Sequence, residues 1–379
     1  MVKVGIERID EYLDIFKNKR VGLITNQTGV DINFKSTIDI LNEKTNLVAL
    51  YSPEHGVRGN IQAGIKLENY IDPATSCPVY SLYGKNRKPT TKMIQNIDVL
   101  CFDIQDVGAR YYTFIYTLAY TMMSAAENNL TYVVFDRPNL VGAKTVEGNI
   151  LDINYRSFVG YYPLPERYGL TVGELAKLYN EEYKINCKLV VIEMKNYERS
   201  MDFEDTKRLF VSPSPNISTA LSGYTYLATC FFEGTNMSEG RGTTSPFKII
   251  GAPWLKTHEL IKDLEKAKLK GVAFRELYFT PMFSKHKGIL CKGIELYVTN
   301  KKIFEPVITG FTLLYLIKEK NKEFEFLSPY HAGKHPMIDL LTGGNFVRKN
   351  SKTLKEIIKK IKEDSISFTL LKERYHLYG

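Results

Sequence analysis

The sequence predicts an α/β protein: a Rossmann-like, mostly parallel sheet with helices on both faces, followed by a smaller C-terminal α+β domain. The chain has 379 residues, and a domain usually holds about 100–200. In the first half, short apolar runs alternate with helical patterns, as in parallel sheets covered by helices. The turn-rich stretch 212–216 precedes a differently patterned second half. We therefore expect domains at residues 1–222 and 223–379.

Each element of the first domain follows from its apolar pattern. Strands are expected at 20–25, 47–51, 97–104, 132–135 and 189–194, and helices at 36–42, 113–128 and 171–183. The last helix carries an N-terminal signature, because Glu174 stands three residues after Thr171 and the two can form a capping box.

The second domain has mixed patterns. Helices are expected at 255–266 and 307–318, and extended segments at 290–298 and 326–327. The lysine-rich stretch 352–362 has apolar residues at helical spacing, which predicts an amphipathic helix packed on a core.

Charge and cysteine content narrow the class of protein. The net charge is +9, which would favour an anionic partner, but the lysines are scattered and indicate a dispersed basic surface, so no nucleic acid is expected. The five cysteines form no C-x-x-C pair, so neither a disulfide framework nor a zinc site is predicted. Cys101 lies in an apolar run and is expected to be a buried thiol.

The N-terminus lacks the apolar core and cleavage site of a secretory signal. No apolar stretch approaches the ~20 residues that a membrane helix needs. We expect a soluble, cytoplasmic protein as the sequence is written, or a secreted one if a leader has been removed.

Polar and glycine-rich clusters follow the carboxyl ends of four predicted strands, at Asn26, Glu54, Asp106 and Asp136. In open α/β sheets, ligands bind outside those ends. Four such loops at the same edge could therefore converge on one cleft.

The cluster 51–59 presents Glu54, His55 and Arg58 on a stiff loop, because Pro53 fixes its own φ and two glycines permit tight turning. A carboxyl group in a partly apolar cleft can have its pKa raised enough to protonate a leaving group. The alternative is an ordinary surface loop with a salt bridge.

In the cluster 102–112, Asp103 and Asp106 are too close in sequence to be identified as a catalytic pair on spacing alone, and no metal motif accompanies them. Arg110 could bind a carboxylate through two parallel hydrogen bonds. Tyr111 and Tyr112 could stack on a sugar ring. Alternatively, Asp106 caps the following helix and the tyrosines pack in the core.

Two further clusters carry charge. Asp136 could pair with Arg137 or with an arginine of a neighbouring loop. The glycine-rich cluster 234–244 contains Glu239 and Arg241, which could face the first domain across a cleft. It lacks the ending of a P-loop and the spacing of a dinucleotide loop, which disfavours a nucleotide site.

These clusters resemble those of a known family, the NamZ-type exo-β-N-acetylmuramidases of glycoside hydrolase family 171. The matching stretches run in family order at 52–59, 103–113, 136–139, 170–176, 213–216 and 234–244. The resemblance implies a Rossmann-like domain, a smaller second domain and a site between them. It implies release of N-acetylmuramic acid from non-reducing ends of peptidoglycan fragments. Tyr168, Leu140, Ala143 and Phe210 depart from the common histidine, proline, glycine and tryptophan, which affects substrate fit rather than chemistry.

The resemblance also assigns roles to the candidate residues. Glu54 is expected to be the general acid, with Asp106 or Glu239 as the second carboxylate, unless the 2-acetamido group of the substrate attacks instead. The lactyl carboxylate of the sugar needs a cation, and the candidates are Arg58, Arg110 and Arg241. The remaining expected binding residues are Asn26, His55, which could orient the acid, Tyr111, Tyr112, Asp136 and Asn236. No metal or organic cofactor is implied, and retention or inversion stays open.

Two other functions are compatible with the same residues. A non-catalytic binder of muropeptides or another anionic glycan would use the same arginines and tyrosines. The Rossmann-like layout alone would also suit a nucleotide-dependent enzyme, because fold does not decide function.

Overall fold

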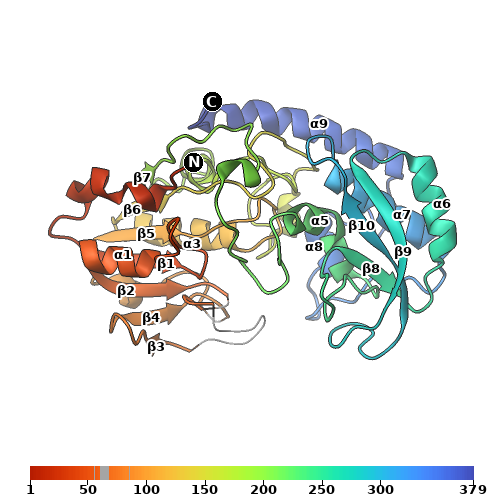
Figure 1. Ribbon diagram of the computed structural model, residues 1–379, viewed down its shortest axis with the longest axis horizontal. Coiled ribbons are helices and arrows are strands. Elements are labelled where there is room, and N and C mark those ends of the chain that lie inside the picture. Colours follow the sequence, from red (N-terminus) through yellow and green to blue (C-terminus); the bar gives the residue numbers. More distant parts are fainter. Residues whose placement is uncertain (55, 60–67, 85) are drawn as a thin grey trace.

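The computed structural model describes residues 1–54, 56–59, 68–84 and 86–379. A sheet-based half and a smaller half lie side by side, and helix α9 (Leu354–Lys372) runs along both (Figure 1). The sheet has seven strands in the order β3-β4-β2-β1-β5-β6-β7. All neighbouring strands are parallel except β3 and β4. The predicted fold class is confirmed.

The strands of this sheet are β1 (Arg20–Thr25), β2 (Asn46–Ser52), β3 (Tyr70–Ile71), β4 (Pro78–Ser81), β5 (Val99–Asp103), β6 (Thr131–Phe135) and β7 (Lys188–Ile192). The helices of this half are α1 (Thr37–Lys44), α2 (Thr91–Ile94), α3 (Phe114–Glu127) and α4 (Val172–Glu181), with 3-10 segments η1 (Gly5–Ile15), η2 (Ile153–Tyr155) and η3 (Glu204–Thr206). β3, β4 and α2 are not predicted by the apolar pattern, because elements of two to four residues are too short to show a period.

The sheet is covered on both faces, as alternate residues of β5 demonstrate. Val99 and Cys101 lie in a core that also contains side chains of η1 and α1. Leu100 and Phe102 point the other way, into a larger core formed with α3 and α4. Cys101 is fully buried, as predicted.

The second half holds an antiparallel sheet in the order β8-β10-β9. Its elements are β8 (Ile249–Ala252), β9 (Val272–Phe279), β10 (Cys291–Val298), α5 (Ser222–Thr229), α6 (Thr257–Ala267), α7 (Pro306–Lys320), α8 (Met337–Thr342) and the 3-10 segments η4 (Cys230–Gly234) and η5 (Glu373–Tyr375). The expected extended segment at 326–327 is confirmed as a single antiparallel bridge: Phe326 pairs with Thr235, and the N–H of Leu327 donates to the carbonyl oxygen of Gly234 at 3.0 Å.

The two halves share one continuous apolar core. Tyr111 of the first half packs edge-on against Phe231 of the second, which in turn packs on Phe311 of α7. The predicted domain boundary after residue 222 falls at the first residue of α5 and stays a prediction.

Helix α9 returns the chain to the first half. Lys372, at its end, is buried and donates to the carbonyl oxygens of Ala143 at 2.9 Å and Gly169 at 2.6 Å. Five residues later, the backbone N–H of Leu377 donates to Glu174 at 2.9 Å. The C-terminus therefore closes over the first half, near the N-terminus (Figure 1).

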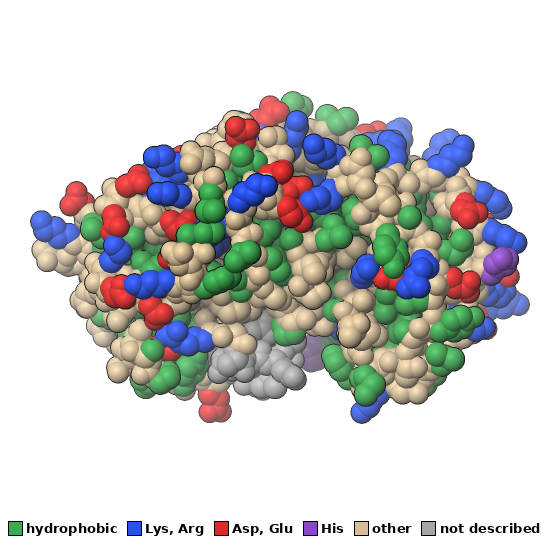
Figure 2. Space-filling view, in the orientation of Figure 1, with side chains coloured by type: hydrophobic (Ala, Val, Ile, Leu, Met, Phe, Trp, Pro, Cys, Tyr) green, Lys and Arg blue, Asp and Glu red, His purple; other side chains and the backbone are tan. Residues whose placement is uncertain are grey.

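Basic and acidic side chains are interspersed over the face in Figure 2, in agreement with a dispersed charge rather than one basic stripe. No helix within the described ranges is both long and apolar enough to cross a bilayer.

Candidate active site

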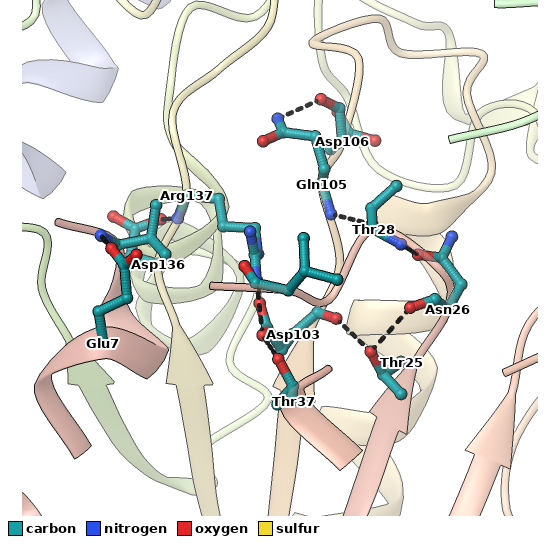
Figure 3. A network of polar contacts seen from close by, with 12 residues as sticks. Glu7, Thr25, Asn26, Thr28, Thr37, Asp103, Gln105, Asp106, Asp136 and Arg137 are labelled. Carbon is teal, nitrogen blue, oxygen red and sulfur yellow. Dashed lines mark hydrogen bonds and ion pairs between the residues drawn. The ribbon is translucent and has the colours of Figure 1, made fainter. Parts of the chain in front are cut away.

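The loops at the carboxyl ends of β1 and β5 are joined by hydrogen bonds (Figure 3). Thr25 donates its hydroxyl to the carbonyl of Asp103 at 2.8 Å. Asn26 accepts from the backbone N–H of Thr28 at 2.9 Å, and the Thr28 hydroxyl accepts from the N–H of Gln105 at 2.9 Å. Parallel strands bring their carboxyl ends to one edge, and these contacts fix the relative height of the two loops.

Asp103 anchors the end of β6 to the end of β5. Its carboxylate is fully buried and pairs with Arg137, whose Nη2 donates to Oδ2 at 2.8 Å (Figure 3). Thr37 donates to the same oxygen. The carboxylate partner of Arg137 is thus Asp103 and not Asp136. Because both charges of this ion pair are buried, we assign it to the structure of the sheet edge.

Asp136 holds helix α4 and the C-terminal segment in place. Its oxygens accept from the hydroxyl of Thr171 at 2.7 Å, the N–H of Gly173 at 2.7 Å and the hydroxyl of Tyr378 at 2.6 Å. Burial raises the pKa of Asp136 to about 7, against the effect of these donors. Thr171 and Glu174 form the predicted capping box.

A cavity of about 160 Å³ opens where the two halves meet. The first half contributes Glu54 after β2 and the segment 111–114 after β5, and the second half contributes residues of α5, η4 and the glycine-rich loop. Its lining includes Glu54, Tyr111, Tyr112, Phe114, Asn216, Tyr226, Glu233, Arg241 and Phe247. Carboxylates, one guanidinium and aromatic faces are therefore assembled in one hollow.

Glu54 reaches the cavity from a loop held by its neighbours. The Tyr83 hydroxyl, which follows β4, forms a hydrogen bond with Glu54, and burial together with that carboxylate raises the pKa of Tyr83 to about 12. Gly59 has a φ of +71°, and a Cβ there would lie 2.9 Å from Gln27, so the turn requires glycine. His55 lies outside the described residues.

Arg241 contributes to the cavity lining from the second half and forms ion pairs with two carboxylates. Its guanidinium lies 2.5 Å from Glu233 and 3.2 Å from Glu239, and it sits 5.1 Å from the ring centroid of Phe247. Lys285 neutralises Glu239 at 2.7 Å. Desolvation raises the pKa of Glu233, Arg241 opposes the shift and Glu239 adds to it. Glu233 keeps 24% of its side chain exposed, so it remains reachable from the cavity.

Tyr112, which lines the cavity, is influenced by two carboxyl groups expected to act in the first half. Burial raises the pKa of its hydroxyl, and the charges of Asp106 and Glu54 both add to the shift. Asp106 accepts from the N–H of Gly108 at 2.7 Å and from the hydroxyl of Tyr168. Burial raises the pKa of Asp106 to about 6.

Asp106 Oδ1 is buried without a hydrogen-bond partner among the described residues. The alternative that Asp106 caps the following helix is wrong, because α3 begins at Phe114 with Thr113 as its N-cap. Tyr168, which departs from the common histidine, is therefore a direct neighbour of a candidate catalytic group.

Arg110 is not brought to this cavity. Its side chain is fully buried, where it pairs with Glu166 and donates to the carbonyl oxygens of Asn149 at 2.7 Å, Leu164 at 2.8 Å and Leu341 at 2.9 Å. Because Leu341 belongs to α8, this guanidinium joins the two halves.

Of the other expected binding residues, Asn26, Arg58, Asp136 and Asn236 lie outside the cavity lining of the described chain. Asn26 is buried in the network of Figure 3. Arg58 pairs with Asp72 at 2.7 Å. Asn236 donates to the carbonyl oxygen of Glu323 at 2.7 Å. Tyr111 does line the cavity, but its hydroxyl is engaged by the Leu227 carbonyl oxygen.

Sequence reasoning missed Glu233 and Tyr83. Glu233 stands one residue before the glycine-rich cluster that was singled out at 234–244, so a slightly wider reading of that cluster would have included it. Tyr83 follows β4, a strand too short to be predicted, and polar residues after that strand were therefore not considered.

Among the described residues, no group of three or more His, Cys, Asp or Glu side chains is placed to hold a metal ion. The site that this fold presents is thus a set of carboxylates with one cation in an aromatic hollow between two domains, an arrangement suited to acid–base work on a polar substrate.

Comparison with known proteins identifies the family. The model of the N-terminal region of the exo-β-N-acetylmuramidase NamZ matches residues 21–221, and the model of its C-terminal region matches residues 224–378. The peptidoglycan β-N-acetylmuramidase NamZ of Bacillus subtilis strain 168 is 48% identical over 384 residues, covering 100% of this chain and 91% of that protein. The chain belongs to the NamZ family, as the resemblance implied.

Two solved structures share the whole fold. Both are crystal structures of DUF1343 family proteins from Bacteroides fragilis NCTC 9343. One, at 1.65 Å resolution, has a TM-score of 0.90 and 36% identity, and the other, at 1.30 Å, has a TM-score of 0.78 and 32% identity. Each alignment covers 100% of this chain and 99% of the other.

Proposed function

We propose that this chain is an exo-acting β-N-acetylmuramidase, a glycosidase that releases N-acetylmuramic acid from the non-reducing ends of peptidoglycan fragments. Its family membership supports the activity. The observation in the chain itself that carries the proposal is the meeting of Glu54 and Arg241, from different domains, in the lining of one cavity.

Glu54 is proposed as the general acid that protonates the glycosidic oxygen. A glycosidase of this kind also needs a second carboxylate, or a substrate group that replaces it. Asp106 and Glu239 were expected in that role, but neither belongs to the cavity lining, and Glu233 becomes a third candidate because it lines the same cavity as Glu54. Tyr83 is a positioning residue for Glu54 through its hydroxyl.

Arg241 is proposed to bind the lactyl carboxylate of the sugar. Its charge is shared by Glu233 and Glu239, so a third carboxylate would have to loosen one of these pairs. Lys285, which already holds Glu239 at 2.7 Å, could retain that partner when Arg241 turns to the substrate. Tyr112, Phe114 and Tyr226 offer aromatic faces to the sugar ring.

The activity is tested by release of 4-nitrophenol from 4-nitrophenyl β-N-acetylmuramide. We expect turnover by the natural chain, and a loss in kcat of about 10²–10⁴-fold in Glu54→Gln, the range that general acid catalysis contributes. The matched control is Glu181→Gln on the exposed end of α4, which should retain full activity. Folded protein without turnover on this substrate or a natural disaccharide would reject the proposed function.

The second carboxylate is tested by the isosteric changes Glu233→Gln, Glu239→Gln and Asp106→Asn. The catalytic one should lose kcat with little change in KM, whereas a group that only neutralises Arg241 should raise KM. If all three retain kcat, the acetamido group of the substrate takes the role.

The partner implied is a peptidoglycan-derived carbohydrate with N-acetylmuramic acid at its end. A reducing compartment is supported by the five free, buried thiols, and this stays a prediction.

A further inference from the structure

One buried arginine differs from the others in having no counterion. Four arginine residues are buried in the described part of the chain, and three of them pair with a buried carboxylate: Arg110 with Glu166, Arg137 with Asp103 and Arg199 with Glu174. Arg167 is only 4% exposed, yet it forms no ion pair within 4.0 Å with any described residue. A buried charge without a partner is costly.

The surroundings of Arg167 satisfy only part of its guanidinium. Nη2 donates to the carbonyl oxygen of Val141, and Cζ lies 5.3 Å from the ring centroid of Tyr224. Nε is buried and has no hydrogen-bond partner among the described residues. The carboxyl group of Glu147 acts on Arg167 from a distance, but burial raises the pKa of Glu147 to about 8, so at neutral pH it is mostly uncharged.

Arg167 lines a cavity of about 310 Å³ between the two domains. The loops 141–145 and 199–205 of the first half form one side, and Lys301 and Lys302, between β10 and α7, form the other. None of its lining residues belongs to the cavity that contains Glu54. It is therefore a separate hollow.

The charges around this cavity leave an excess of cations. Lys301 is neutralised by Asp202 at 2.7 Å and by Glu204 at 2.6 Å. Lys144 and Lys302 are exposed and, within the described ranges, make no ion pair. With Arg167 they provide three positive charges without an ion pair, against Asp205 and the second of the two carboxylates at Lys301, so one net positive charge remains.

We propose that this interdomain cavity is a binding site for a small oxyanion, a carboxylate or a phosphate monoester, with Arg167 at its base and Lys144 and Lys302 at its mouth. The anion supplies the counterion that the chain itself gives to every other buried arginine of the described structure. Guanidinium groups bind both oxyanions through charge-assisted hydrogen bonds. Since both domains line the site, a bound anion would stabilise their association.

The test is thermal unfolding in inorganic phosphate and, separately, in acetate, each compared with sodium chloride at equal ionic strength. A ligand that binds only the folded state raises Tm with the logarithm of its concentration above Kd, by about 3 °C at a hundred times Kd for a chain of this size. A response to phosphate alone assigns a phosphoryl group, a response to acetate alone assigns a carboxylate, and a response to both supports the shared oxyanion site.

The double variant K144E/K302E locates the site, and K262E on the exposed face of α6 is the control with the same kind of charge reversal. Both altered lysines of the site are exposed, so the variant should fold, and its Tm in chloride checks this. We expect the apparent Kd of the anion to rise at least tenfold in K144E/K302E and to stay unchanged in K262E. No response beyond chloride, or equal responses in the two variants, overturns the proposal.

Discussion

Replacing Arg110 with methionine tests whether this arginine holds the domains together or binds substrate. The change removes one ion pair with Glu166 and donors to three backbone carbonyl oxygens, all fully buried. Breaking a buried pair costs about 3–5 kcal/mol. Burial already raises the pKa of Glu166 to about 7, while Arg110 lowers it, so in the variant this carboxyl group will take up a proton, which keeps the loss within that range.

The expected shift in Tm follows from the size of the chain. With an unfolding entropy of about 2.1 cal/mol/K per residue, a loss of 3–5 kcal/mol lowers Tm by about 4–6 °C if the 379 residues unfold as one unit. The control is Arg20→Met, which breaks the exposed pair with Asp98 and should shift Tm far less.

Differential scanning calorimetry measures this shift, and the muramidase assay is run on the same samples. The double variant Arg110→Met/Glu166→Leu should regain part of the stability, because it removes both buried charges. An unchanged Tm in Arg110→Met together with lost turnover would show that Arg110 serves the substrate and that the structural assignment is mistaken.

Two further predictions concern buried carboxyl groups. Glu147 has a folded-state pKa raised to about 8 from an ordinary value of 4.5, so its contribution to stability is present below about pH 4.5 and is lost as the pH rises to about 8. Glu147→Gln should flatten the fall of Tm across that window, and an unaltered slope would contradict the assignment. Tyr168→Phe removes a donor that lowers the pKa of Asp106. If Asp106 acts as the ionised carboxylate, the acidic limb of the pH profile of kcat/KM should move to higher pH in this variant. An unmoved limb would assign the role of the ionised carboxylate to another residue.

Local sequence patterns predicted most strands and helices of the first half. The period of the apolar residues predicted the five longer strands of the parallel sheet and the helices on both faces, because alternation and helical spacing are visible over five or more residues. The capping box of Thr171 and Glu174 was equally local. The motif at 51–59 was likewise found from local pattern, and Glu54 lies in the lining of the cavity between the domains, while its role as the general acid stays a prediction.

What the sequence determined by itself is the fold class, the family and the set of ionisable residues at the strand ends. Only the tertiary structure decided which of them meet. Arg110 and Arg241 look alike in sequence, but Arg110 is sealed against Glu166 while Arg241 reaches the cavity with Glu233. The reason is physical: the exposure of a charge and the identity of its partner depend on contacts between residues far apart along the chain, which no local pattern encodes.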